Sequence, residues 1–208
     1  MSKLTSRAAP MAPEERRQAI VEAVIPLLVR HGATVTTRQI AEAAGVAEGT
    51  IFRAFPDKCA LMHAAARAVL DPGNGNGRIT DIDAALDLES TVRELAGLLL
   101  VRMDQVVAVM VAVRGALAQQ GTHGKNVPGR EGPPEFVLEA HRALLASLTE
   151  VLARHRGDLR VEPERAALML RSLVLGSRHP GIEPAHRLTA EEITTVLVSG
   201  ITDTGQRS

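Results

Sequence analysis

Two side chains with useful hydrogen-bonding chemistry, Thr50 and Arg53, stand three residues apart in a segment without proline. If that segment is helical, the spacing places both on one face of the helix. Arginine can donate paired hydrogen bonds to a guanine edge, and threonine can donate, accept or touch a thymine methyl. Ala47 and Glu48 fall on the same outward face, with Phe52 at its margin. These residues form a candidate surface for contact with bases.

The surrounding sequence predicts two short helices that meet through a tight turn. Thr36 and Gln39 form a capping box, so a helix begins after Thr36 and extends to residue 44. Gly45 lies where the turn needs a positive φ, which glycine adopts without strain. The second helix is predicted over 48–55. The positions that face inward and lock the pair are small or apolar: Ile40, Ala41, Ala44, Val46 and Ile51.

This arrangement is a helix-turn-helix, whose second helix enters the major groove of DNA and presents its first residues to base edges. Similar spacings also occur in purely structural helical hairpins, so the spacing alone leaves that alternative open. Charge does not decide between them. The segment from Arg30 to Lys58 holds four basic residues (Arg30, Arg38, Arg53, Lys58) and three acidic ones (Glu42, Glu48, Asp57).

The run TTRQIAEAAGVAEGTIFRAFPDKCAL, residues 36–61, resembles the DNA-binding signature of the TetR family of repressors. The resemblance extends over about residues 14–70. Two later segments, PERAALMLRSLVLGSRHP at 163–180 and LTAEEITTVLVSG at 188–200, resemble the regulatory half of one TetR group. Residues 72–133 add nothing to it. The matching positions are Ile40, Ala41, Ala44, Gly45, Val46, Gly49, Thr50, Ile51, Phe55, Lys58 and Leu61.

The resemblance implies which residues contact DNA. Thr37 and Gly49 would do so through their backbone, and Thr50, Arg53 and Lys58 through their side chains. Lys58 would bind a phosphate at the start of the following helix, where backbone N–H groups also point. The full predicted DNA-binding set is Thr37, Arg38, Ala47, Glu48, Gly49, Thr50, Phe52, Arg53 and Lys58.

Three positions depart from the family pattern. Ala47 stands where a hydroxyl residue is usual, so the second helix loses an N-cap. Phe52 stands where tyrosine is common, so a phenol-to-phosphate hydrogen bond is absent. Ala54 replaces a frequent histidine. These changes imply weaker DNA binding, or compensation by other basic residues, namely Arg38, Lys3, Arg7, Arg16 and Arg17.

The fold predicted for the whole chain is all-α, with an N-terminal three-helix DNA-binding bundle joined to a larger helical domain for ligand binding and dimerisation. The expected divisions are a disordered tail at 1–12, the DNA-binding domain at 13–57, a linking helix at 58–72, the second domain at 73–203 and a tail at 204–208. Within the second domain we expect a flexible linker at 73–80, two helices filling 84–119, a loop at 121–134, and helices at 135–156, 163–177 and 190–202.

The last two predicted helices suggest a dimer. The segment 163–177 is apolar nearly all round, and a helix of that kind needs burial on every side. The helix predicted at 190–202 carries an apolar stripe, and the two helices together could form a two-fold four-helix interface, as the resemblance also implies. Ordinary core packing in a monomer is the alternative. The predicted interface residues are Leu170, Leu173, Val174, Ile193, Leu197 and Ile201.

A ligand cavity is expected between the helices of 95–117 and 135–156. Its predicted lining is Leu99, Arg102, Val106, Val107, Met110, Arg114 and His141. The polar members could instead be solvated or paired on the surface. If one arginine faces the cavity, an acidic or carbonyl-bearing ligand is favoured.

Composition argues against other classes of protein. The 208 residues hold 24 basic and 24 acidic side chains, so DNA contacts must be local. Aromatic residues make up 1%, which disfavours a binder of RNA or single-stranded DNA. No catalytic or metal-ligand motif is present, so we expect neither enzymatic activity nor a cofactor. The one cysteine, Cys59, lies at a helix start that can lower a thiol pKa, but its position favours packing.

The start of the chain lacks a signal peptide, and the apolar run from Leu95 to Val113 is interrupted by Arg102, Asp104 and Gln105. We therefore expect a cytoplasmic protein. The sequence predicts a homodimeric regulator that binds a palindromic DNA operator, represses, and is released by a small-molecule ligand. Activation remains open, as does the direction of the ligand's effect. The alternative is a helical interaction module whose helix-turn-helix no longer binds DNA.

Overall fold

The computed structural model describes residues 12–71, 73, 76–119 and 134–202, and over these ranges the chain is helical with no strand. The helices are α1 (Pro13–His31), α2 (Thr37–Ala43), α3 (Glu48–Ala54), α4 (Lys58–Leu70), α5 (Asn76–Thr80), α6 (Leu88–Gln119), α7 (Glu135–Ala153), α8 (Pro163–Ser177) and α9 (Ala190–Ile201). The all-α prediction is confirmed. The predicted tails and the predicted loop 121–134 fall almost entirely outside the described residues.

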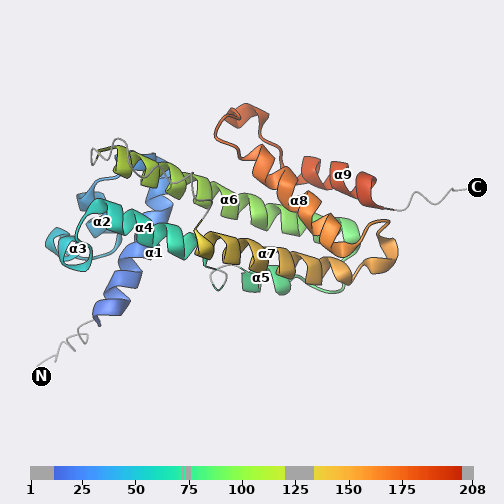
Figure 1. Ribbon diagram of the computed structural model, residues 1–208, viewed down its shortest axis with the longest axis horizontal. Helices are drawn as coiled ribbons and strands as arrows, with labels where there is room; N and C mark the ends of the chain where they lie inside the picture. Colours follow the sequence, from blue (N-terminus) through green and yellow to red (C-terminus); the bar gives the residue numbers. More distant parts are fainter. Residues whose placement is uncertain (1–11, 72, 74–75, 120–133, 203–208) are drawn as a thin grey trace, which may run out of the picture.

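The molecule is elongated, with α1–α4 gathered at one end and α5 and α7–α9 toward the other (Figure 1). α6 runs between the two ends and packs against α1 and α4 as well as against α8 and α9. The connection between the halves therefore includes α6 as well as the predicted linking helix α4.

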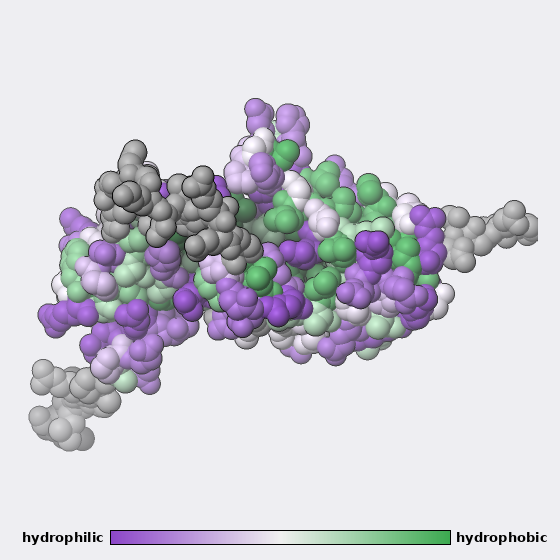
Figure 2. Space-filling view, viewed as in Figure 1, coloured by the Kyte–Doolittle hydropathy of each residue, from purple (hydrophilic) through white to green (hydrophobic). Residues whose placement is uncertain are grey.

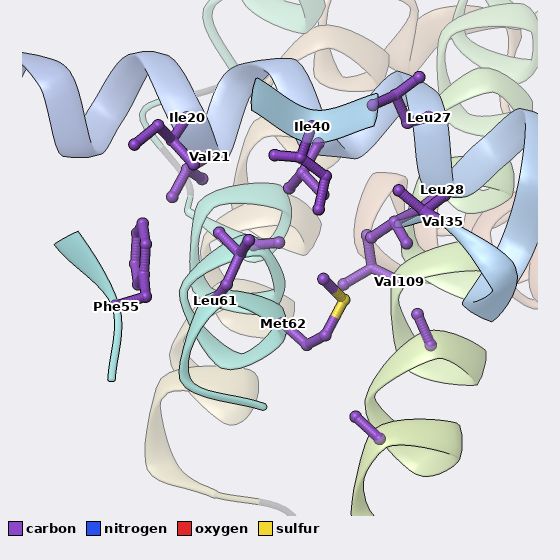
Figure 3. Close-up of a cluster of buried hydrophobic side chains, with 14 of the residues drawn as sticks. Ile20, Val21, Leu27, Leu28, Val35, Ile40, Phe55, Leu61, Met62 and Val109 are labelled. Atoms are coloured by element: carbon purple, nitrogen blue, oxygen red, sulfur yellow. The ribbon is translucent and has the colours of Figure 1, made fainter. Parts of the chain in front are cut away.

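Each half of the molecule is held together by its own cluster of buried apolar side chains. The first is formed by α1, α2, α3 and α4 with the C-terminal part of α6, and Figure 3 shows side chains such as Leu28, Met62 and Val109 in it. The second is formed by α5, α7, α8 and α9 with the N-terminal part of α6, including Leu95 and Leu99. Each half therefore has its own core, and α6 contributes to both.

The short-range signals predict the N-terminal helices correctly. Thr36 accepts a hydrogen bond from the Gln39 backbone, and the Gln39 side chain accepts from the Thr36 backbone at 2.9 Å, which completes the capping box. Gly45 adopts a φ of 65° in the turn. Asp57 begins α4 by accepting from the Ala60 N–H at 2.7 Å. Each of the two caps joins residues three positions apart, so the local sequence is enough to predict them.

The prediction of two helices within 84–119 is wrong, because one helix of 32 residues, α6, covers most of this segment. It contains no proline, and its glycines do not stop it, because leucine, valine and alanine on either side continue into the two cores. By length and composition alone α6 could cross a membrane. Of its central polar residues, Asp104 pairs with Arg178 of the α8–α9 connection, with 2.9 Å between Oδ1 and Nε.

The second half of the predicted flexible linker at 73–80 is instead helical. Residues 76–80 form α5, and Ile79 is 2% exposed within the second core. Local glycine content suggested flexibility, but burial of Ile79 and Ile82 against α6 and α7 orders this segment.

The two conformational roles of glycine provide a matched stability test. Replacing Gly45 by alanine places a Cβ at a positive φ and should lower the free energy of unfolding by about 1 kcal/mol, although nothing lies within 4 Å of that Cβ. Replacing Gly97 by alanine, in the middle of α6 and also in open space, should raise it by about 0.5–1 kcal/mol through helix propensity. Urea unfolding followed by circular dichroism measures both. Equal effects of the two substitutions would contradict this account.

Candidate functional site

The helix-turn-helix is a compact unit closed by backbone hydrogen bonds. The Val46 N–H donates to the Ala41 carbonyl at 2.9 Å, and the Gly45 N–H donates to the Glu42 carbonyl at 3.2 Å. Ile40 and Ile51, one from each helix, are buried beneath the turn. The side chains predicted to lock α2 against α3 therefore lie inward, with Ala44 and Val46 partly buried at the same core.

The opposite side of α3 is open to solvent. Ala47, Glu48, Gly49, Phe52 and Arg53 are exposed, and Thr50 is half-buried. Phe52 is 57% exposed, which is unusual for an aromatic side chain with no polar group. The predicted face is thus available, and its largest member is apolar.

The remaining predicted contacts lie on the neighbouring helices. Arg38 is exposed on α2, Thr37 is half-buried at the first position of α2, and Lys58 is half-buried at the first position of α4. The Thr37 hydroxyl donates to the Glu48 carboxylate at 2.6 Å, so α2 holds the acidic side chain that begins α3. The sequence analysis named both residues without predicting this bond, because their partnership depends on how the two helices cross.

The loss of a cap predicted at Ala47 is confirmed. α3 begins without any side-chain cap, and in its first turn the Thr50 N–H donates to the Ala47 carbonyl at 2.8 Å. A missing cap costs roughly 0.5–2 kcal/mol of helix stability. A helix of seven residues with no cap must be held by its surroundings.

Arg17 of α1 supplies part of that support at the other end of α3. Its guanidinium donates to the Ala54 carbonyl, and it lies 4.2 Å from the centre of the Phe55 ring, which is buried. Arg17 was named as a basic residue that could help bind DNA. In the structure Arg17 contacts the C-terminal end of α3 and helps to position that helix, and its predicted contact with DNA stays a prediction.

Two cavities lie beside the last turns of α4. The larger, which we call the joint cavity, has a volume of about 750 Å³ and is bounded by α1, α4, α5 and α6. The smaller, of about 510 Å³, lies on the α7 side of α4 between α1 and α7. Ala68 lines both. The Arg67 guanidinium lies 4.8 Å from the centre of the Phe136 ring and connects α4 to α7.

The predicted ligand-pocket residues are not brought together in one place. Leu99 and Arg102 line the joint cavity. Val106 packs against the N-terminal core, Val107 is half-buried, and Met110 and Arg114 are exposed. His141 is exposed on α7, where partial burial lowers the pKa of its imidazole and the Arg171 guanidinium lowers it further. Because α6 is one continuous helix, side chains at successive positions along it point toward different neighbouring elements or toward solvent.

The predicted dimer-interface residues pack inside the chain itself. Leu170, Val174, Ile193, Leu197 and Ile201 are between 0% and 3% exposed in the second core, and Leu173 is half-buried against it. Their side chains are therefore largely covered within one chain, except for Leu173, which keeps part of its surface exposed, and the predicted interface stays a prediction. The apolar side chains left on the outer faces of α8 and α9 are Met169, Leu175 and Val196, exposed by 39%, 48% and 61%. Figure 2 shows apolar surface over this part of the molecule.

Comparison with known proteins agrees with the fold and the site. Residues 20–65 match the family model described as bacterial regulatory proteins, tetR family. No curated protein matches the sequence. The matched segment contains the helix-turn-helix, and the chain as a whole shares the helical fold of solved TetR-family regulators.

Similar solved structures share low identity but cover nearly the whole chain. A TetR transcriptional regulator from Streptomyces coelicolor is 21% identical, with a TM-score of 0.60 over 91% of this chain and 99% of its own. AibR in complex with isovaleryl coenzyme A and operator DNA is 19% identical, with a TM-score of 0.50 over 90% and 98%. A complex of SmeT with triclosan is 19% identical, with a TM-score of 0.51 over 91% and 93%.

Cys59 behaves as a packing residue in this structure. It is 8% exposed in the N-terminal core, and burial raises the pKa of its thiol, with a further increase from the Asp57 carboxylate. The lowering that a helix start can produce is therefore outweighed.

We predict that Cys59 reacts slowly with a disulfide reagent such as dithionitrobenzoate in the native protein. At pH 8 the rate should be at least about tenfold below that of the urea-unfolded chain, because both thiolate formation and access are reduced. Because the pKa is raised, the native rate should still increase above the pH at which the unfolded chain levels off. Equal native and unfolded rates would show that the thiol is accessible and activated.

Proposed function

We propose that this chain is a sequence-specific transcriptional regulator, a repressor that binds a palindromic operator as a homodimer and is released by a small-molecule ligand. The observation that carries the proposal is the exposed face of α3, held in place by the buried Ile51 and Phe55 and by Arg17. The proposal describes a cytoplasmic regulator and not an enzyme.

In this proposal α3 enters the major groove. Arg53 and Thr50 contact base edges, and Lys58 binds a phosphate at the start of α4. Glu48 would be repelled by phosphates, so its carboxylate is best suited to accept from a cytosine amino group, with Thr37 fixing its orientation. Phe52, being exposed and apolar, is suited to a thymine methyl. AibR, a protein of similar fold, has been seen with operator DNA.

A dimer would double the few base contacts that one seven-residue helix can make. The exposed apolar side chains Met169, Leu175 and Val196 support an interface formed by α8 and α9, because burial against a partner would remove their surface from water. These residues lie on the same two helices that the sequence analysis selected, and Met169 is one turn before the half-buried Leu173.

A ligand would release the protein from DNA by shifting the balance between two conformations of the dimer. A ligand that binds better to the conformation with widely separated recognition helices would shift the dimer away from DNA, and DNA would weaken ligand binding by the same factor. Triclosan in the SmeT complex and isovaleryl coenzyme A in the AibR complex are small molecules bound by proteins of this fold.

A second candidate function is a helical interaction module that does not bind DNA. The uncapped α3 and the 57% exposed Phe52 favour it, because an apolar aromatic on a short helix could equally contact a protein. Selection of duplex DNA separates the two functions.

Selection from a random duplex pool should enrich a palindrome with the unaltered protein. The Arg53→Ala variant should bind that palindrome with about 1–3 kcal/mol less affinity and lose its base preference at one position of each half-site. The Arg160→Ala variant, altered at an exposed residue between α7 and α8, should behave as the unaltered protein. Failure to enrich any sequence at low salt would favour the interaction module.

Lys58 should contribute to DNA affinity through its charge and not through recognition of the base sequence. In the Lys58→Ala variant, affinity for the selected palindrome and for unrelated duplexes should fall together, and the slope of log affinity against log salt should decrease by about 1 per protomer. Fluorescence anisotropy over a salt series measures this. A change in the selected sequence would instead assign Lys58 a base contact.

Substituting the exposed face of α9 should prevent dimer formation. Val196→Arg introduces a charge into the proposed interface and should yield monomers in sedimentation velocity. Leu138→Arg, at an exposed apolar position of α7, is the matched control and should leave the dimer intact. Dissociation by the control but not by Val196→Arg would move the interface to α7.

A further inference from the structure

Glu48 is the one acidic residue in the set of side chains predicted to face DNA. The cations of that set are Arg38, Arg53 and Lys58. Glu48 is exposed on the same side of the domain as Arg53, at the first position of α3. Proteins gain affinity for any duplex by neutralising its phosphates. A carboxylate on this face therefore lowers the affinity for DNA in general, and it must contribute something other than affinity.

The Glu48 carboxylate is held by the fold although it is exposed. The Thr37 hydroxyl donates to its Oε1 at 2.6 Å, and this bond joins the first residue of α2 to the first residue of α3. Hydrogen bonds from a hydroxyl to an ionised carboxylate measure about 2.5–2.7 Å and are stronger than those between neutral groups. Because the hydroxyl is neutral, the bond fixes the direction of the carboxylate without cancelling its charge.

A carboxylate that only accepts hydrogen bonds can face few bases in the major groove. Guanine presents two acceptors there, and thymine presents an acceptor and a methyl group, so both place lone pairs against lone pairs. Adenine presents its amino donor beside the N7 acceptor. Cytosine presents its N4 amino donor with no acceptor on the same edge. Among the four bases, cytosine is therefore the one that a fixed carboxylate accepts without repulsion.

We propose that Glu48, directed by Thr37, determines the sequence specificity of this regulator by repulsion. It weakens binding to every duplex except one that places a cytosine opposite Glu48 in each half-site. Thr37 is a positioning residue, because it acts through Glu48. This inference rests on the proposed function, which places α3 in the major groove.

Two neighbours of Glu48 on the exposed face act in the same direction. Ala47 has no side-chain donor, and Phe52 has no hydroxyl, so neither side chain can donate to a phosphate. Contacts with phosphates carry no sequence information, and specificity is a difference between affinities for right and wrong partners. Loss of attraction to the backbone together with repulsion from wrong bases raises that difference, even when a seven-residue helix makes few base contacts.

The first test compares the sites that the unaltered protein and the Glu48→Gln variant select from a random duplex pool. The unaltered protein should enrich a palindrome with one cytosine in each half-site whose replacement weakens binding about tenfold. Glutamine has nearly the same size but pairs with adenine through N6 and N7, so Glu48→Gln should select adenine at that position. Identical selected sequences would overturn the assignment of Glu48.

The second test measures affinity for unrelated duplexes by fluorescence anisotropy. Glu48→Gln should bind them about threefold to fivefold more tightly than the unaltered protein at low salt, because one repulsion is removed, and the gain should shrink as salt is added. Glu42→Gln is the matched control, since it removes the same charge from an exposed position of α2 outside the predicted DNA-binding set. Equal gains in the two variants would assign the effect to net charge and overturn repulsion by Glu48.

The third test separates positioning by Thr37 from a merely structural role. Thr37→Val keeps the shape of the side chain without the donor, so the Glu48 carboxylate can turn toward water and the preference for cytosine should weaken at least about threefold. Added to Glu48→Gln, the same substitution should change neither the preferred base nor the affinity, because the two residues act as one unit. Equal effects of Thr37→Val in both backgrounds would overturn its action through Glu48.

The outcomes distinguish this inference from the proposed function. If the unaltered protein and Glu48→Gln are both folded by circular dichroism and neither selects a sequence, the proposed function fails and this inference fails with it. If the unaltered protein selects a palindrome and Glu48→Gln keeps both its base preference and its affinity for unrelated duplexes, this inference alone is overturned.

Discussion

The burial of α6 in two separate cores is the constraint on which the rest of the structure depends. Val109, Ala112 and Val113 close the N-terminal core, while Leu95 and Leu99 close the other. Neither half can therefore reach its packed state without this helix, and the free energy of apolar burial couples them. A continuous helix of 32 residues that contributes to both cores joins the two halves directly.

α3 differs from α6, because almost all of its stability comes from contacts with other elements and almost none from the helix itself. α3 has seven residues and no side-chain cap, so an isolated helix of this sequence would not persist. Ile51 and Phe55 in the core, the Thr37–Glu48 hydrogen bond and Arg17 at the Ala54 carbonyl hold it from three directions. Apart from Glu48, which the Thr37 hydroxyl holds, the exposed side chains of its outer face supply none of these supports. Residues there can differ from the family pattern, as Ala47 and Phe52 do, without loss of the fold.

α4 combines features of the buried α6 and of the more exposed α3. It is buried along Leu61, Met62 and Ala65, yet its last turns border two cavities. Its last turns still bury Ala66 and Val69 in the N-terminal core, so this end of α4 is packed on one side and open to the cavities on others.

Local chemistry in the sequence was sufficient for the N-terminal helices, because the Thr36 capping box, the Gly45 turn and the Asp57 cap each join residues only a few positions apart. Contacts between distant segments decided the rest. Whether residues 84–119 form one helix or two, whether 76–80 is ordered, and which faces of α8 and α9 remain exposed all depend on what packs beside them. An apolar residue such as Leu170 or Val196 has the same sequence signature in a core as at an interface, since hydrophobic burial has no direction. The sequence therefore determined where α3 begins and which side chains it presents, and only the tertiary structure decided which apolar side chains are covered within the chain and which stay exposed.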